Sequence, residues 1–415
     1  KNTTGAPEWA FWQREAMKEH WRILHWYLDQ VQLWNGELGG VWNDDTDHIE
    51  NWYDHALCMD DDDKIKNGIR KFCDGLWNYQ LEEGVGKYVQ DACHFYEEGM
   101  GNMGMRLLID YGDPIPFARA LSTCSHYDQW MRQKPDGKYE WISEYMSING
   151  AWTMREFGSN PGYGGHKYDI LVPGGYLVWY NRHPGVAKIY RGLDCREGFH
   201  GSAHDRVTDF AAAKKRYAEE MLKPAGRGGP REYLIRMDEL GVSEELRKAN
   251  PIEFKAPGPI AHYWGSHDTE AHYANWRLTG DTRWLVESYK RVCEWFHSHD
   301  WLNSEARPCL DRNPLPRGSL VRARMGSIAT NRGASGLTWP LHGLSYTRGA
   351  NAVAALVTVN LDTQLEARFY SFPEQPHEMQ LRVWRLHPGT YKVVLSNDKN
   401  DDGKPEEAVW QKEMK

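Results

Sequence analysis

Hydrophobic positions in the first 350 residues recur at helical spacing. From about residue 8 to residue 350, stretches rich in Trp, Leu, Met, Glu, Lys and Arg alternate with loops rich in Gly and Pro. Such spacing of apolar side chains is typical of amphipathic helices. Three of these stretches resemble one another, at residues 54–73, 105–124 and 273–293. Each predicts a helix, a short acidic turn and a second helix.

The acidic turns give these copies a common layout. In each copy an Asp stands 11 or 12 residues before a Cys, and in two of them it follows a Gly. Gly ends one helix and Asp caps the next. The first two copies begin about 51 residues apart, so about six or seven hairpins of that size would fill the helical region. We therefore predict a mainly α fold, an (α/α)6–7 toroid of helical hairpins, with an irregular helical domain as the alternative.

After residue 350 the pattern changes to short alternating or β-branched runs. Pro and Gly turns separate them, and the runs lie at residues 351–359, 365–370, 379–386 and 390–395. This pattern is typical of antiparallel strands. The sequence thus predicts an (α/α) toroid over residues 1–350 and a small antiparallel β-sheet or sandwich domain over residues 351–415.

Composition narrows the function classes. The net charge is -8 and no polybasic stripe is present, which disfavours nucleic acid as a partner. No apolar run approaches the ~20 residues of a membrane span. The seven Cys lack C-x-x-C spacing, so a zinc ribbon or disulfide framework is not expected. Trp (20) and Tyr (22) far outnumber Phe (11); such rings suit hydroxylated ligands such as sugars, although helix packing explains part of the excess.

The first candidate site is an acidic segment at residues 36–48, which we expect to form a loop before a helix. Three carboxylates and an imidazole lie within five residues, at Asp44, Asp45, Asp47 and His48. Such clustering serves a shared proton or a cation. Oxygen ligands with one nitrogen suit Ca²⁺ or Mn²⁺, so a divalent cation is possible although none is required. The alternative is an Asp-rich cap on a solvated helix.

This segment resembles the loop of family 9 glycoside hydrolases, which are inverting enzymes built on a six-hairpin toroid. Their pattern is Gly-Gly, two residues, then Asp-Ala-Gly-Asp-His; Asp44, Asp47 and His48 match it, with Asp45 and Thr46 in place of Ala-Gly. The resemblance implies that Asp44 and Asp47 bind and deprotonate the attacking water. Trp42 is then a candidate substrate contact. Glu98, or its neighbour Glu97, is the candidate proton donor of such a two-carboxylate site.

Two further polar segments suit another reaction. Residues 147–204 are too Gly-rich and too long to be a mere connection, and residues 261–273 are rich in His and Tyr. Cleaving a uronate chain by β-elimination needs a base, an acid and donors that stabilise the enolate-like charge. We expect the catalytic groups to be His204, Tyr263, His267 and Asn149. The candidate substrate contacts are Arg155, His166, His200, Trp264, Arg324 and Arg332; the two last arginines alternatively bridge the two domains.

In overall layout, an α toroid followed by an antiparallel β domain, the chain resembles the toroid polysaccharide lyases, in which Asn, His, Tyr and Arg share a cleft. This implies a lyase acting on a uronate-containing polysaccharide. The alternatives are an inverting glycoside hydrolase and a noncatalytic glycan-binding protein. The expected partner is a polysaccharide or oligosaccharide, the oligomeric state stays open, and the expected location is secreted or periplasmic, with no signal peptide in this sequence.

Overall fold

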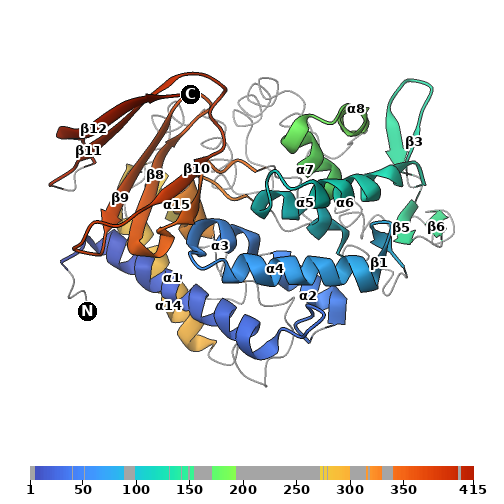
Figure 1. Ribbon diagram of the computed structural model, residues 1–415, viewed down its shortest axis with the longest axis horizontal. Coiled ribbons are helices and arrows are strands. Elements are labelled where there is room, and N and C mark those ends of the chain that lie inside the picture. The colour runs from blue at the N-terminus through green and yellow to red at the C-terminus, as the bar shows by residue number, and fades with distance from the viewer. Residues whose placement is uncertain are drawn as a thin grey trace, which may run out of the picture.

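The computed structural model describes residues 5–39, 41–50, 52–87, 99–129, 131–141, 143–147, 150–153, 171–192, 272–273, 275–277, 279–299, 315, 318–329, 340–400 and 403–415. The described part is mainly helical, with small antiparallel sheets both at residues 81–153 and at residues 344–414, on opposite sides of Figure 1. Its α-helices are α1 (Glu8–Trp26), α2 (Val41–Glu50), α3 (Trp52–Met59), α4 (Lys64–Gly75), α5 (Met100–Ile109), α6 (Pro114–Ser125), α7 (Leu171–Asn181), α8 (Pro184–Gly192), α14 (Arg283–Ser298) and α15 (Gly318–Met325). Shorter helical turns are η1 (Tyr27–Val31), η2 (Leu76–Gln80), η4 (Tyr127–Gln129) and η9 (Ala350–Ala352).

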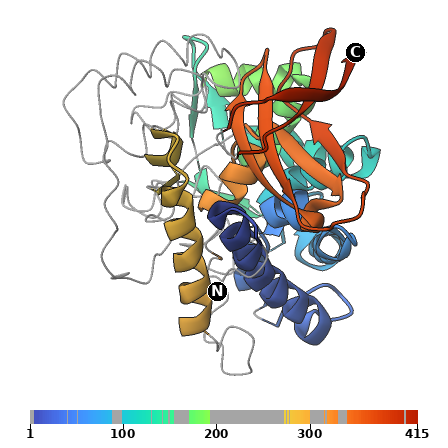
Figure 2. The same cartoon turned by 90° about the vertical axis from the view of Figure 1, so that its left-hand side faces the viewer.

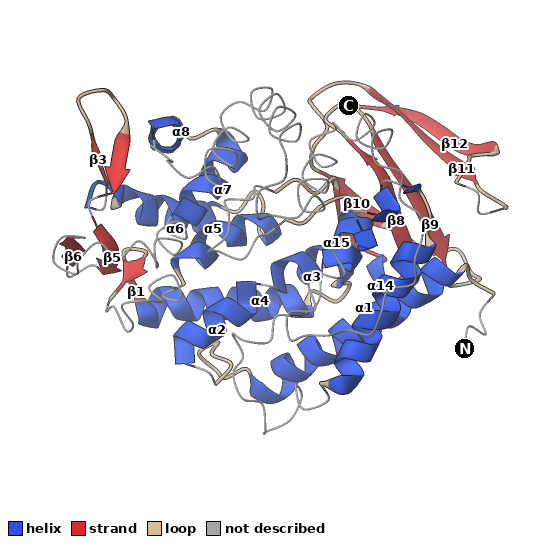
Figure 3. Cartoon of the chain, turned by 180° about the vertical axis from the view of Figure 1, so that it is seen from behind, coloured by secondary structure: helices blue, strands red, loops and turns tan. Residues whose placement is uncertain are grey.

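Every described strand pairs antiparallel with one other. The strands are β1 (Leu81–Glu82), β2 (Val85–Gly86), β3 (Met131–Gln133), β4 (Tyr139–Trp141), β5 (Ser143–Ser147), β6 (Gly150–Thr153), β7 (Leu344–Arg348), β8 (Val353–Asn360), β9 (Leu365–Ser371), β10 (Gln380–Val383), β11 (Tyr391–Asn397) and β12 (Glu407–Met414). The pairs are β1–β2, β3–β4, β5–β6, β7–β10, β8–β9 and β11–β12. In the view from behind, the strands from β7 onward stand together on one side of the helices (Figure 3).

The predicted helical hairpins are present. In the first copy α3 leads through an acidic turn into α4, and Asp60 accepts the backbone N–H groups of Ile65 and Lys66. In the second, α5 leads into α6, where Asp113 caps the helix by accepting the Ile115 N–H at 2.8 Å. In the third, Gly280 has φ of 72° between helical residues and α14. Closure of these hairpins into a toroid remains a prediction.

Two local expectations were wrong. Residues 41–48, expected as part of a loop, lie in α2, because Trp42, Asp45–Thr46 and Ile49 repeat at helical spacing and are buried or half-buried. Strands β3 to β6 lie in the region expected to be helical. Their runs are too short to bury a helical stripe and alternate as strands do.

Strand β8 joins the helices to the sheets. It packs against α1 and α15, and its residues belong to the same buried core as α1, α3 and α14. In the view turned by 90°, α14 runs beside α1 beneath the strands (Figure 2). Strand β7 precedes residue 350 and pairs with β10 after it. The division into domains 1–350 and 351–415 stays a prediction.

Candidate functional site

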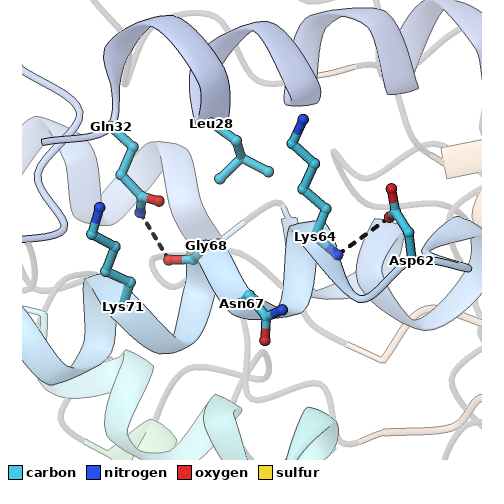
Figure 4. A pocket seen from close by; sticks show the side chains of 7 residues that line it. All are labelled: Leu28, Gln32, Asp62, Lys64, Asn67, Gly68 and Lys71. Atoms are coloured by element: carbon cyan, nitrogen blue, oxygen red, sulfur yellow. Dashed lines mark hydrogen bonds between the residues drawn. The ribbon is translucent and has the colours of Figure 1, made fainter. Parts of the chain in front are cut away.

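A groove lies between the end of α1 with η1 and the outer side of α4 (Figure 4). Its volume is about 410 Å³, which is within the range of small-ligand sites. The seven lining residues are Leu28, Gln32, Asp62, Lys64, Asn67, Gly68 and Lys71. We call this feature the Lys71 groove. Polar side chains dominate it, so it suits a hydroxylated or charged ligand better than an apolar one.

Gln32 links the two walls of the groove by hydrogen bonds. Gln32 donates from its amide to the carbonyl oxygens of Gly68 at 2.9 Å and Gly36 at 3.2 Å. Gly68 has no side chain because Leu28 occupies that space, where a Cβ would lie 2.1 Å from a Leu28 methyl carbon. The spacing of the two walls is therefore fixed by the packing of Leu28 against Gly68 and by the hydrogen bonds of Gln32.

The two lysines of the groove differ in their electrostatics. Lys64 forms an ion pair with Asp29 at 2.6 Å, and its backbone N–H donates to Asp62. Lys71 is exposed and makes no ion pair with any part of the chain that the structure describes. An unpaired ammonium on a protein of net charge -8 attracts an anion locally. Lys71 is thus the group of this groove that is available to a ligand carboxylate.

An aromatic surface adjoins the groove. It consists of Trp34, which is 78% exposed, Tyr79, which is 50% exposed, and the half-buried Trp42 behind them. The rings of Trp34 and Tyr79 meet edge to face at 6.0 Å, and Trp42 stacks on Tyr79 at 6.4 Å with 16° between the planes. We call these three residues the Trp34 platform. Neighbouring exposed rings of this kind are a candidate binding surface.

The turn that presents Trp34 is fixed by a glycine. Gly36 has φ of 105°, and a Cβ there would meet the Lys71 carbonyl oxygen at 2.5 Å. Only Gly combines this φ with such close approach. Trp34, two residues earlier, is consequently held beside the helix that carries Lys71. Through this turn the Trp34 platform is linked to the backbone of the helix that carries Lys71.

Several residues singled out from the sequence lie near this surface. Trp42 belongs to the platform, and the acidic segment follows it along α2, where positions 47 and 48 come about one helical turn after position 44. Asp45 is fully buried and accepts the Leu38 N–H at 2.6 Å. His48 is also buried, with its ring 4.7 Å from Tyr27 and 5.4 Å from Trp52. Two of the predicted cation ligands, Asp45 and His48, are therefore buried and in contact with other protein groups.

Arg324 has a structural role, which differs from the predicted substrate contact. It is fully buried and its five N–H groups all donate to protein acceptors. The acceptors are the carbonyl oxygens of Cys58, Ala350 and Val353 and the side-chain oxygen of Gln13. A guanidinium has only five donors, so none remains for a substrate.

The other predicted residues fall outside the described part of the chain. They are Glu98, Asn149, Arg155, His166, His200, His204, Tyr263, Trp264, His267 and Arg332. The side chains of Asp44 and Asp47 are likewise outside the description, although the backbone of both lies in α2. Trp42 and the acidic residues therefore share helix α2. The residues predicted for β-elimination are not tested by the structure.

Sequence reasoning missed Trp34, Tyr79 and Lys71. Trp34 stands in a short Asn-Gly turn between helical segments, and an aromatic residue in a polar turn is a signal that could have identified it. Lys71 and Tyr79 carry no such mark, because each fits an amphipathic helix. Tyr79 becomes notable because its ring meets that of Trp34, and Lys71 because it lines the groove.

Comparison with known proteins gives no further indication: no family model, no curated protein and no solved structure matches this chain. Within the described ranges no helix has the length and apolar character needed to cross a bilayer. Nor do three or more His, Cys, Asp or Glu side chains converge as a metal site among the residues that can be described. The functional argument therefore depends on the site itself.

Proposed function

We propose that the protein binds a uronate-containing polysaccharide on the Trp34 platform and the Lys71 groove and cleaves it by β-elimination. The observation that carries the proposal is that one short stretch of the chain, from Lys71 to Tyr79, supplies both an exposed lysine without an ion pair among the described residues and a ring that meets the exposed Trp34. A pyranose presents an apolar C–H face that packs on an aromatic ring, and a uronate adds one carboxylate for an ammonium group. Neutral glycans would use only the first of these contacts.

The proposed reaction needs no co-reactant. A base removes the proton on the carbon next to the carboxylate, the electron pair forms a C=C bond, and the glycosidic C–O bond breaks. An acid returns a proton to the leaving oxygen. His204, Tyr263 and His267 are the candidates for base and acid, and Asn149 is the candidate donor to the enolate-like oxygen.

Inverting hydrolysis is the second candidate, because α2 links the Trp34 platform directly to the acidic segment. Asp44 and Asp47 follow Trp42 on the same helix, separated by one turn. Under this alternative they activate a water and Glu98 protonates the leaving oxygen. If a divalent cation binds, Asp44 and Asp47 are its nearest candidate ligands.

Digestion of acidic polysaccharides separates the candidates. Polygalacturonate, alginate and hyaluronan are incubated with the protein, and ultraviolet absorbance from unsaturated uronate is followed together with reducing ends. Both signals rise for a lyase. Reducing ends without absorbance would replace β-elimination with hydrolysis. No cleavage with retained binding would leave a glycan-binding protein, and neither cleavage nor binding on any polymer would overturn the proposal.

Variants of the surface test the binding part. Trp34→Ala is expected to weaken glycan affinity about tenfold, which corresponds to ~1.4 kcal/mol. Lys71→Gln is expected to weaken it several-fold and to reduce its dependence on salt. Ile115→Ala and Lys188→Gln are matched controls, because both residues are exposed and lie on other helices. Equal effects of test and control variants would contradict the assignment of this surface.

A further inference from the structure

The hairpin formed by β11 and β12 is exposed along its whole length. All eight residues of β12 are exposed, and β11 is exposed at five of its seven positions, with Tyr391 and Ser396 half-buried. The two strands pair only with each other. They stand away from β8 and β9 at the C-terminal end of the molecule (Figures 1 and 3). A lone two-stranded hairpin is marginally stable in water.

One face of this hairpin is apolar. The register places Tyr391 opposite Met414, Val393 opposite Lys412 and Leu395 opposite Trp410. Directly paired residues point to the same side of a ladder, and alternate residues along a strand share that side. These six residues therefore form one surface, which we call the Trp410 face. Leu395 is 56% exposed and Trp410 is 46% exposed, so the described chain leaves this surface open.

A single cation stands at the centre of the Trp410 face. Lys412 lies between the Tyr391–Met414 pair and the Leu395–Trp410 pair, about 7 Å from each along the strand at the usual rise. It makes no ion pair with any residue that the structure describes. On the other face, Lys392 stands opposite Glu413, so its charge has a neighbour of opposite sign. The unbalanced positive charge is therefore confined to the apolar face.

We propose that the Trp410 face is a second contact surface for the acidic polysaccharide, separate from the Lys71 groove. This inference rests on the proposed function, because it takes the same ligand class. Trp410 and Lys412 on β12, with Tyr391 diagonally across on β11, fit an extended chain of uronate units: the rings pack on sugar C–H faces and the ammonium group pairs with a carboxylate. The surface lengthens the contact with a polymer without adding to that with a short oligosaccharide.

A second copy of the chain fits this face less well. In a two-fold contact of Trp410 faces, each Lys412 would approach its own symmetry mate in an apolar setting, and like charges there are destabilising. Pairing along the open edge of β12 is also disfavoured. The register shifts between Leu395 and Ser396, which leaves Val409 as an extra residue, and such bulges interrupt strand addition.

Retention in native gels that contain polygalacturonate or alginate tests the proposal on the full chain. Lys412→Gln and Trp410→Ala are each expected to raise the apparent dissociation constant about three- to tenfold, and hydroxyethyl cellulose serves as the neutral polymer. Lys392→Gln is the matched control: it removes a lysine from the same hairpin but from the opposite face. It is expected to change retention less than twofold. Circular dichroism checks that the variants fold, and Lys412→Gln avoids any loss of apolar packing.

The outcomes separate this inference from the proposed function. Retention that Trp34→Ala weakens while Lys412→Gln and Trp410→Ala do not would overturn the second surface and leave the first. Retention of the unmodified protein by neither acidic polymer would overturn both. A dimer in sedimentation that Trp410→Ala converts to a monomer, with retention unchanged, would assign the Trp410 face to a second copy instead. Equal losses for Lys412→Gln and Lys392→Gln would also overturn it.

Discussion

The ladders β8–β9 and β11–β12 have similar pairing but differ in how much of each is buried. Each is a two-stranded antiparallel pair with seven paired positions and one register shift. Strand β8 is buried at six of its eight residues beneath α1 and α15, whereas β12 is exposed at every residue. Similar strand patterns thus lead to a core element where helices cover the ladder and to an open surface where they do not.

The difference extends to the backbone at the strand edges. Gln13 from α1 donates to the Ala355 carbonyl oxygen at 2.9 Å and accepts the Ala355 N–H at 2.7 Å. Arg324 donates to the Val353 carbonyl oxygen at 2.8 Å. These side chains complete hydrogen bonds that a neighbouring strand would otherwise make, which a buried edge requires. The covered ladder is therefore specified by polar contacts as well as by apolar burial.

The largest effect is expected from Arg324→Met at the covered ladder. It leaves three buried carbonyl oxygens without these donors and removes one of two donors to the Gln13 side-chain oxygen, and each unsatisfied buried group costs about 1–3 kcal/mol. We expect a loss of about 3–5 kcal/mol in the unfolding free energy, measured by urea denaturation. Arg348→Met is the control, because its ion pair with Glu378 is exposed to solvent and contributes little to stability. Equal losses would remove the structural role of Arg324.

A pair of leucines tests the same contrast with apolar side chains. Leu356→Ala in β8 removes a fully buried side chain and is expected to cost about 3 kcal/mol. Leu395→Ala in β11 removes one that is 56% exposed and is expected to cost below about 0.5 kcal/mol. Thermal and urea unfolding of both variants measure the difference. A large loss for Leu395→Ala would show that the Trp410 face is covered in solution.

Acid is expected to weaken the junction between α15 and β7. His342 is fully buried there, with its ring 5.1 Å from Trp384, and neither ring nitrogen has a hydrogen-bond partner among the described residues. Burial, with the nearby charge of Arg385, lowers its pKa to about 3. The unfolded chain, with a pKa near 6.5, therefore binds this proton first as the pH falls. Stability is lost below about pH 6.5, by about 2 kcal/mol at pH 5.

Substitution identifies the group responsible. His342→Leu is expected to reduce the slope of the urea midpoint against pH between pH 6.5 and pH 4. The reduction should equal the contribution of one proton bound by the unfolded chain. His377→Gln, at an exposed position, is the control and should leave the slope as it is. An unchanged slope in His342→Leu would mean that other groups determine the acid sensitivity.

Sequence alone predicted local structure better than it predicted the site. The helical hairpins and four strands followed from pattern, because α4 buries one side and β8 is a short run of apolar and β-branched residues. Strand β12 was missed, since its residues Glu407–Met414 have no buried face to impose a pattern. Trp42 was identified from a motif, but Lys71 becomes notable only through the approach of Gly36 to its backbone. Arg324 shows the converse, because a basic residue in a basic segment gave no sign that every donor is used internally.

The smallest effect concerns the contact that holds the open hairpin to the covered ladder. Asp398, in the turn after β11, forms an ion pair with Arg368 of β9 at 3.0 Å and accepts the Gly403 N–H. Asp398→Asn keeps an oxygen acceptor for the turn and removes the charge. We expect below about 1 kcal/mol of change in global stability, because the pair is partly exposed. Amide hydrogen exchange should nevertheless rise several-fold in β11 and β12 and stay unchanged in β8 and β9. Faster exchange in both ladders would show that they open as one unit, and unchanged exchange in both would show that the ion pair does not anchor the hairpin.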